Sequence, residues 1–233
     1  MDESDSRWMN AIHTAQVVRS PKQHLATFGV TNLQYHVVTE PSYRDLAPGE
    51  EESVIREGRV VSQRPAIVTP TYMLGLEGFS EQARNYMESL AQRLGPQSPG
   101  ILYQYRNEPG GIQIVSGRVP VVAKRIAEDL DKRGADMSAV IVGTDDLWDV
   151  SVLKFIYEHT AKSVASNVSE MQARGLLDPV PGLNVPRGVI QRIEELFRQV
   201  EEGLDPKVLH KELVRWNLFD HYENRFFSLF RTK

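Results

Sequence analysis

Apolar and polar positions recur with two different periods along the chain. Up to about residue 146, short runs with a period of two, typical of strands, alternate with runs spaced by three and four, typical of helices. Beyond that point only the helical spacing recurs. We therefore predict a mixed region of strands and helices followed by a helical region.

The clearest pattern lies between Gly111 and Trp148. Two apolar runs, 112–115 and 139–142, read as strands, and residues 119–130 between them carry one apolar face at helical spacing. This order predicts a βαβ unit with the two strands as parallel neighbours, and the crossover of such a unit is almost always right-handed. The loops that follow them would then meet at one edge of the sheet, where open α/β folds bind ligands.

The remaining elements follow from the same periods and from Gly, Pro and capping residues. The predicted strands are 33–39, 54–61, 66–69 and 101–106. The predicted helices are 5–19, 79–94, 147–174, 189–200, 206–216 and a short one from residue 220. The segment Asn107-Glu108-Pro109-Gly110-Gly111 is predicted to be a hairpin turn.

Together these elements predict an α/β fold with a mixed sheet, at least one parallel βαβ unit and a helical C-terminal region. We expect a mixed α/β domain at residues 1–175 that ends in the long helix, and a helical C-terminal extension at 176–233. Three prolines between residues 176 and 186 indicate a linker there.

Composition narrows the function classes. The chain has 233 residues, of which 41% are hydrophobic and 25% charged, values that allow a normal core. It contains no cysteine, which excludes disulfides, thiol catalysis and thiolate metal sites. The acidic N-terminus does not resemble a signal peptide, and no apolar run reaches the roughly 20 residues that span a bilayer. We therefore expect a soluble, cytoplasmic protein without a membrane contact.

The loop Ser116-Gly117-Arg118 opens a helix directly after a strand, and Thr144 follows the second strand of the pair. Free N–H groups at a helix start attract anions, and Arg118 adds a positive charge. These four residues are our candidate ligand-binding positions for a small phosphorylated ligand. The alternative is a simple tight turn, because a Walker-type phosphate loop and a Gly-x-Gly-x-x-Gly motif are both absent from the sequence.

Asp145 and Asp146 follow the same buried strand and form the best candidate metal site. Carboxylates at the end of a strand are typical ligands of Mg²⁺, the one cofactor that the sequence suggests. The alternative is that they cap the following helix, whose first turn favours acidic residues. The sequence assigns no catalytic residue.

Two aromatic groups suggest binding surfaces. Tyr103 and Tyr105 share one strand face, as base-stacking residues do, although the net charge of −4 disfavours nucleic acid. The segment 216–230 is dense in aromatic residues that must be buried, either on the chain's own domain or against another subunit or protein partner.

Without a complete catalytic motif, we interpret the chain as a non-catalytic cytosolic binding or assembly protein that forms a homo-oligomer. The first alternative is a Mg²⁺-dependent hydrolase of phosphate esters or nucleotides at the 116–118/144–146 sheet edge. The second is a nucleic-acid-binding module.

Overall fold

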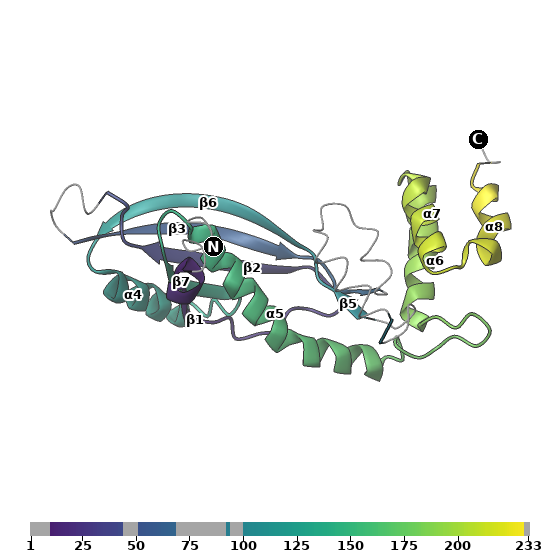
Figure 1. The fold of residues 1–233 in the computed structure, drawn as a ribbon, viewed down its shortest axis with the longest axis horizontal. Coiled ribbons are helices and arrows are strands. Elements are labelled where there is room, and N and C mark those ends of the chain that lie inside the picture. The colour runs from purple at the N-terminus through teal and green to yellow at the C-terminus, as the bar shows by residue number, and fades with distance from the viewer. Residues whose placement is uncertain (1–9, 44–50, 69–91, 94–99, 231–233) are drawn as a thin grey trace. The chain divides into compact units, whose positions relative to one another are not determined.

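The fold divides into two compact units (Figure 1). The computed structural model describes residues 10–43, 51–68, 92–93 and 100–230. The first unit consists of the described parts of Met1–Arg64 and Tyr103–Val168. The second consists of the described parts of Pro65–Leu102 and Ser169–Lys233.

A five-stranded mixed sheet forms the first unit, in the order β1-β7-β2-β3-β6. The strands are β1 (Gln16–Arg19), β2 (Thr31–Thr39), β3 (Glu52–Ser62), β6 (Tyr105–Ser116) and β7 (Ser138–Gly143). Within the described sheet β2 and β7 are the one parallel pair of neighbours, and the other neighbours are antiparallel. β6 is an edge strand and forms the outer rim of the sheet in Figure 1.

Side chains alternate between the two faces along each strand, so both faces of this sheet carry apolar residues. One helix packs on each face. Leu33, Tyr35 and Val37 of β2 face α5 (Trp148–Ala173), which adds Val152, Phe155 and Ile156 to their core. Val38 and Val140 face the opposite way, towards α4 (Val119–Lys132) and its buried residues Val119, Val122, Ala123 and Leu130. The apolar stripes of the two helices therefore pack against the two sides of one sheet.

The second unit is built mainly from helices around its own core. Its elements are α6 (Arg187–Glu201), α7 (Pro206–Arg215), α8 (Phe219–Ser228) and the strand pair β4 (Ala66–Val68) and β5 (Gly100–Leu102). Buried core residues shared by the three helices include Ile193, Phe197, Leu209, Leu213, Tyr222 and Phe226. The side chain of Asp205 caps α7 by accepting a hydrogen bond from the Lys207 N–H at 2.9 Å.

The fold class is confirmed: the sheet is mixed, it contains a parallel pair, and the C-terminal region is helical. The helix at 119–130 and the long helix at 147–174 correspond to α4 and α5. Gly134 ends α4 with φ of +65°, a left-handed conformation that glycine adopts without strain.

Three local predictions are wrong. Residues 16–19 form β1 rather than the end of a helix at 5–19, because pairing with β7 gives their backbone strand partners. Residues 107–111 are not a hairpin turn but lie inside β6, where a bulge accommodates the two glycines. The strands at 112–115 and 139–142 run parallel but are not neighbours, because β2 and β3 lie between β6 and β7.

Two predicted segments fall largely outside the described residues. They are most of the helix at 79–94 and residues 44–50 of the segment 40–52, whose prolines, glycine and acidic residues predict an exposed loop.

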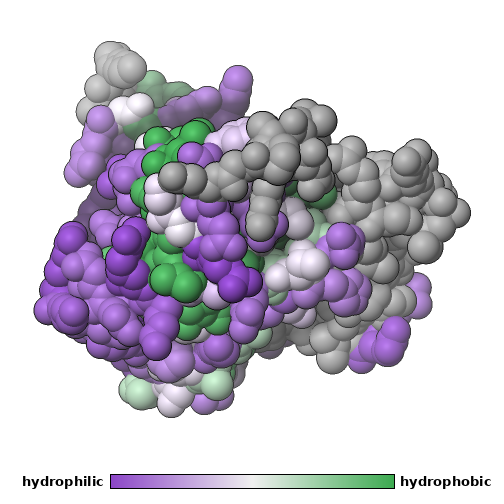
Figure 2. Space-filling model, turned by 90° about the vertical axis from the view of Figure 1, so that its left-hand side faces the viewer, coloured by the Kyte–Doolittle hydropathy of each residue, from purple (hydrophilic) through white to green (hydrophobic). Residues whose placement is uncertain are grey.

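Hydrophobic side chains also reach the surface. The side of the molecule drawn in Figure 2 is mostly hydrophilic, but hydrophobic surface gathers in a strip between the polar areas. Large hydrophobic residues exposed in the described part of the first unit are Val18, Val30, Tyr43, Ile112, Ile114, Val121, Leu153, Tyr157 and Val164.

Candidate functional site

The two loops predicted to form one ligand site follow β6 and β7, whose carboxyl ends point in the same direction. The strand order separates them, however. Three inter-strand steps divide β6 from β7, which corresponds to about 14 Å at roughly 4.8 Å per step. The structure therefore does not bring Ser116, Gly117 and Arg118 next to Asp145 and Asp146.

The loop after β6 is bound tightly to β3. The Gly117 N–H donates to the Glu51 carbonyl at 2.6 Å, and the Ser53 hydroxyl donates to the Gly117 carbonyl at 2.7 Å. The Arg118 guanidinium lies 3.5 Å from the Glu51 carboxylate and is largely exposed. Pro120 in the first turn of α4 supplies no N–H, which leaves one donor fewer for an anion. These contacts fix a turn, and its exposed Arg118 is paired with the exposed Glu51.

Asp145, which follows β7, is bonded to Thr39 at the end of β2 and to Arg56 within β3. Its Oδ1 accepts a hydrogen bond from the Thr39 hydroxyl at 2.8 Å and forms an ion pair with Arg56, and its Oδ2 accepts from the Ser42 N–H at 3.1 Å. The Arg56 guanidinium also lies 6.0 Å from the centre of the Trp148 ring. Burial by itself raises the pKa of the Asp145 carboxyl, but the bonds from Arg56, Thr39 and Ser42 together hold it below its usual value.

The sequence left two roles open for Asp145 and Asp146, a metal site and a cap of the following helix. Neither Asp145 nor Asp146 lies within the first turn of α5, which begins at Trp148 and where Asp149 Oδ1 accepts from the Val150 N–H. A cation at Asp145 would have to compete with the Arg56 guanidinium for the same oxygen. Within the described residues, no three His, Asp or Glu side chains are grouped as a metal site.

Thr144 lies between the end of β7 and Asp145. The Thr144 hydroxyl oxygen is buried and has no hydrogen-bond partner in the described part of the chain. It lies beside a carboxylate whose two oxygens are already bonded. The arrangement supports a structural connection between β7, β2 and β3.

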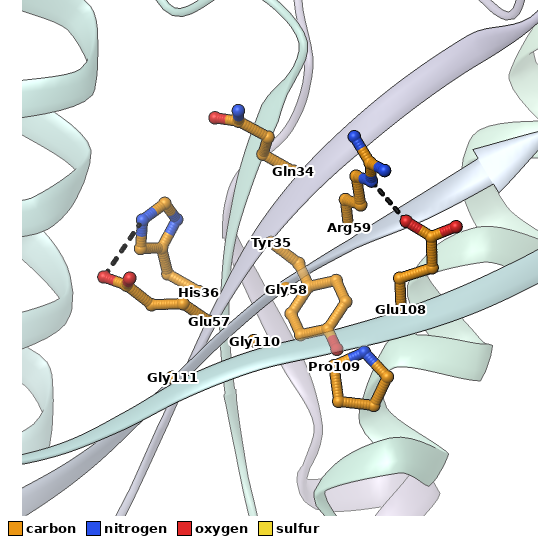
Figure 3. A pocket seen from close by; sticks show the side chains of 10 residues that line it. All are labelled: Gln34, Tyr35, His36, Glu57, Gly58, Arg59, Glu108, Pro109, Gly110 and Gly111. Atoms are coloured by element: carbon orange, nitrogen blue, oxygen red, sulfur yellow. Dashed lines mark hydrogen bonds and ion pairs between the residues drawn. The ribbon is translucent and has the colours of Figure 1, made fainter.

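A second candidate site, which the sequence did not indicate, is an open groove of about 440 Å³ across β2, β3 and β6 (Figure 3). Its lining residues are Gln34, Tyr35, His36, Glu57, Gly58, Arg59, Glu108, Pro109, Gly110 and Gly111. The groove surrounds the bulge between β3 and β6. Gly58 is required there, because a Cβ at this position would collide with the Tyr35 hydroxyl and lie 2.9 Å from the Glu108 carbonyl.

The charged groups of the groove are already paired. Figure 3 shows the His36–Glu57 pair and the Arg59–Glu108 pair on either side of the Tyr35 ring. His36 Nε2 lies 3.6 Å from Glu57 Oε1, and burial lowers the pKa of His36. The hydrogen bond from Arg59 lowers the pKa of the Glu108 carboxyl. The groove is a polar surface without an assembled nucleophile and base.

The glycines that line this groove were predicted to form a turn. Gly110 and Gly111 follow Pro109, which indicated a turn, whereas paired glycines within a strand also mark a bulge. A Cβ on Gly110 would lie 3.0 Å from the Glu57 carbonyl, so the close approach of β3 explains the glycine.

The two tyrosines considered for base stacking are packed against α5. The Tyr103 hydroxyl donates to Asn167 Oδ1 at 2.7 Å, and the Tyr105 hydroxyl bonds to the Thr160 hydroxyl. Burial raises the pKa of Tyr103 to about 12. Their rings join the core between the sheet and α5, and so they do not form an open stacking platform.

The aromatic C-terminal segment is divided between core and surface. Within 216–230, the residues Trp216, Leu218, Tyr222 and Phe226 are buried in the helical unit. Phe227 and Phe230, in contrast, expose 47% and 54% of their surface. Both rings contact Phe226, with ring centres 5.8 and 5.5 Å apart, and Phe227 also lies 6.2 Å from Phe219. The segment therefore stabilises its own unit and still presents two aromatic rings outwards.

Comparison of the chain with protein-family models, with curated proteins and with solved structures found no match in any of the three. Among the described helices, none combines the length and the apolar character needed to cross a lipid bilayer.

Proposed function

We propose that this chain is a non-catalytic assembly protein that self-associates through the surface formed by Phe227 and Phe230, called here the α8 surface. The observation that carries the proposal is the exposure of these two rings beside a buried aromatic cluster. Exposed aromatic residues are costly in water and are enriched where proteins bind one another.

The surroundings of the α8 surface support this proposal. His210 of α7 lies 5.0 Å from Phe219 and 5.6 Å from Phe226, measured between ring centres. Val214, one helical turn beyond His210, is 55% exposed. Half-exposed Phe rings each leave roughly 100 Å² of apolar surface in water, worth about 2.5 kcal/mol per ring at 25 cal/mol/Å² when buried. Rings of this kind act as anchors at an interface.

The two alternatives lack such an observation. The candidate Mg²⁺ ligand Asp145 is bonded to Arg56, and the candidate stacking residues Tyr103 and Tyr105 are packed against α5. A cytoplasmic location, which we propose as well, is supported by the absence of cysteine from the chain.

The experiment is sedimentation equilibrium of the wild type, of Phe227→Ser/Phe230→Ser and of Val208→Ser. Removal of residues 217–233 is unsuitable, because it would delete the core residues Leu218, Tyr222 and Phe226. Val208 is an exposed residue of the same unit, about 200° around α7 from His210, and serves as the matched control.

We expect the double Phe variant to associate at least tenfold more weakly than the wild type, and the Val208 variant to associate like the wild type. Identical association of all three proteins would refute the α8 surface.

A further inference from the structure

Among the described strands, β6 has a neighbour on one side only, and the contacts at its two ends show which of its backbone groups point to the open side. Near its start the Gln63 N–H donates to the Gln104 carbonyl at 2.9 Å, and after its end the Gly117 N–H donates to the Glu51 carbonyl. Antiparallel strands present alternate residues to a neighbour, and the bulge inserts one extra residue. Counting from either end, the N–H and C=O groups of Ile112 and Ile114 point away from β3, towards the open edge.

The two halves of this edge differ in how well they are shielded from pairing with another strand. Proteins shield exposed edges with charges, prolines or bulges, since a bare edge pairs with other strands. Pro109 and the bulge shield the first half, where Pro109 has no N–H to offer. After the bulge, from Ile112 to Gly117, the sequence contains no charged residue. Ile112 and Ile114 are 64% and 55% exposed, so the second half is both bare and apolar.

We propose that this half of β6 pairs with β6 of a second copy of the chain, antiparallel and about a two-fold axis through Gln113. Ile112 of each copy then lies opposite Ile114 of the other. Both residues face the open edge, so each such pair exchanges two backbone hydrogen bonds. The two five-stranded sheets become one continuous sheet.

The isoleucines select this register. A shift that places the axis at Ile112 or at Ile114 keeps the hydrogen-bonding alternation but sets the other isoleucine opposite Gly110 or Ser116. With the axis at Gln113, the four isoleucines of the two copies lie side by side on one face of the sheet. This follows because residues two apart in a strand, such as Ile112 and Ile114, point to the same face. Apolar residues directly opposite one another stabilise a strand pair.

Charge at the two ends also fits a second copy. At one end of the bare segment, the charged side chains on β6 and their β3 partner carry a net charge of +1: Arg106, Glu108 and Arg59. Glu57 of β3 points the other way, towards His36 of β2. The other end is flanked by two glutamates and an arginine, a net charge of −1: Glu51, Glu52 and Arg118. Antiparallel pairing brings the positive end of each copy to the negative end of the other, which favours self-pairing.

The test uses the absence of cysteine from the natural chain. In Gln113→Cys the two axis residues form a non-hydrogen-bonded pair with Cα atoms about 4.5 Å apart, within the range that a disulfide spans. Diamide, which takes up the two thiol hydrogens, would oxidise the pair to a covalent dimer. Val121→Cys, at a comparably exposed position on α4, is the control.

We expect Gln113→Cys to cross-link roughly tenfold or more faster than Val121→Cys, because pairing raises the effective thiol concentration. Adding Ile112→Lys and Ile114→Lys should abolish this advantage, while circular dichroism shows that the triple variant stays folded. Equal cross-linking rates at positions 113 and 121, or an advantage that survives the lysines, would overturn the proposal.

This inference does not depend on the α8 surface. In the Phe227→Ser/Phe230→Ser background the cross-linking advantage of Gln113→Cys should persist. Failure of one interface is thereby distinguished from failure of the other.

Discussion

The contact between Arg56 and Asp145 predicts a measurable loss of stability when either charge is removed. The side chains are 17% and 13% exposed, so water screens the pair only in part. In Asp145→Asn the amide can still accept from Thr39 or Ser42, but the ion pair is lost. Breaking a buried pair costs about 3–5 kcal/mol, and we expect about 2 kcal/mol here because of the partial exposure and the remaining bonds.

The assay is urea unfolding followed by circular dichroism at pH 7, on the wild type, Asp145→Asn, Arg56→Met and the double variant. Since each single variant leaves a charge without its partner, the two losses should not add. We expect the double variant to lose about 2–3 kcal/mol rather than about 4. Losses below about 0.5 kcal/mol, or strictly additive losses, would refute the structural role of the pair.

Acid provides a second check on the same pair. Because the pKa of Asp145 is lowered in the folded state, its stabilisation is present above the usual carboxyl pKa and declines as pH falls through the folded value. The stabilities of wild type and Asp145→Asn should therefore converge in acid. A Mg²⁺ ligand would behave differently, since Asp145→Asn would then change stability chiefly when the metal is present.

Two further predictions concern buried groups of the first unit. Burial lowers the pKa of His159 to about 4, so the unfolded chain binds its proton first and stability falls as pH drops from 7 to 5, by about 2 kcal/mol for this group. In urea unfolding, the free energy of unfolding of His159→Leu should depend less on pH between 7 and 5. An equally steep pH dependence in the variant would contradict the lowered pKa of His159. Gly58→Ala should cost about 2 kcal/mol through the collision with Tyr35, whereas Gly111→Ala, with open space at its Cβ, should cost under about 0.5 kcal/mol. Equal costs at both glycines would contradict the close contact.

Local periodicity was sufficient to predict α4, β7 and α5, because each shows its apolar pattern within one uninterrupted segment. The same holds for the helices of the second unit, where glycine marks the ends: Gly203 follows α6 with φ of +114°. The fold class could be predicted for this reason.

Strand order could not be predicted, because it depends on contacts between distant segments. The crossover from β6 to β7 passes two strands, and nothing in α4 itself encodes that distance. The partner of Asp145 was missed for the same reason: Arg56 lies 89 residues earlier in the chain. Local patterns suggested that Asp145 is a helix cap or a metal ligand. In the structure its carboxylate forms an ion pair with Arg56 of β3.

For the C-terminal segment 216–230, the sequence predicted burial but not which rings would be buried. Its density of aromatic residues predicted burial, which Trp216, Tyr222 and Phe226 confirm. Which rings remain outside depends on how α7 and α8 cross, and the sequence does not specify this. Phe227 and Phe230 became candidates only when the helices were placed.

The most direct measurement is sedimentation velocity of four proteins over a range of concentrations. They are the wild type, Phe227→Ser/Phe230→Ser, Ile112→Lys/Ile114→Lys and the combination of all four changes. Two self-complementary interfaces allow growth beyond a dimer, whereas one interface stops at a dimer. We expect the wild type to exceed the mass of a dimer at high concentration, each double variant to stop at a dimer, and the combined variant to remain a single chain. A wild type that stays a single chain at every concentration would contradict the central claim that this is an assembly protein.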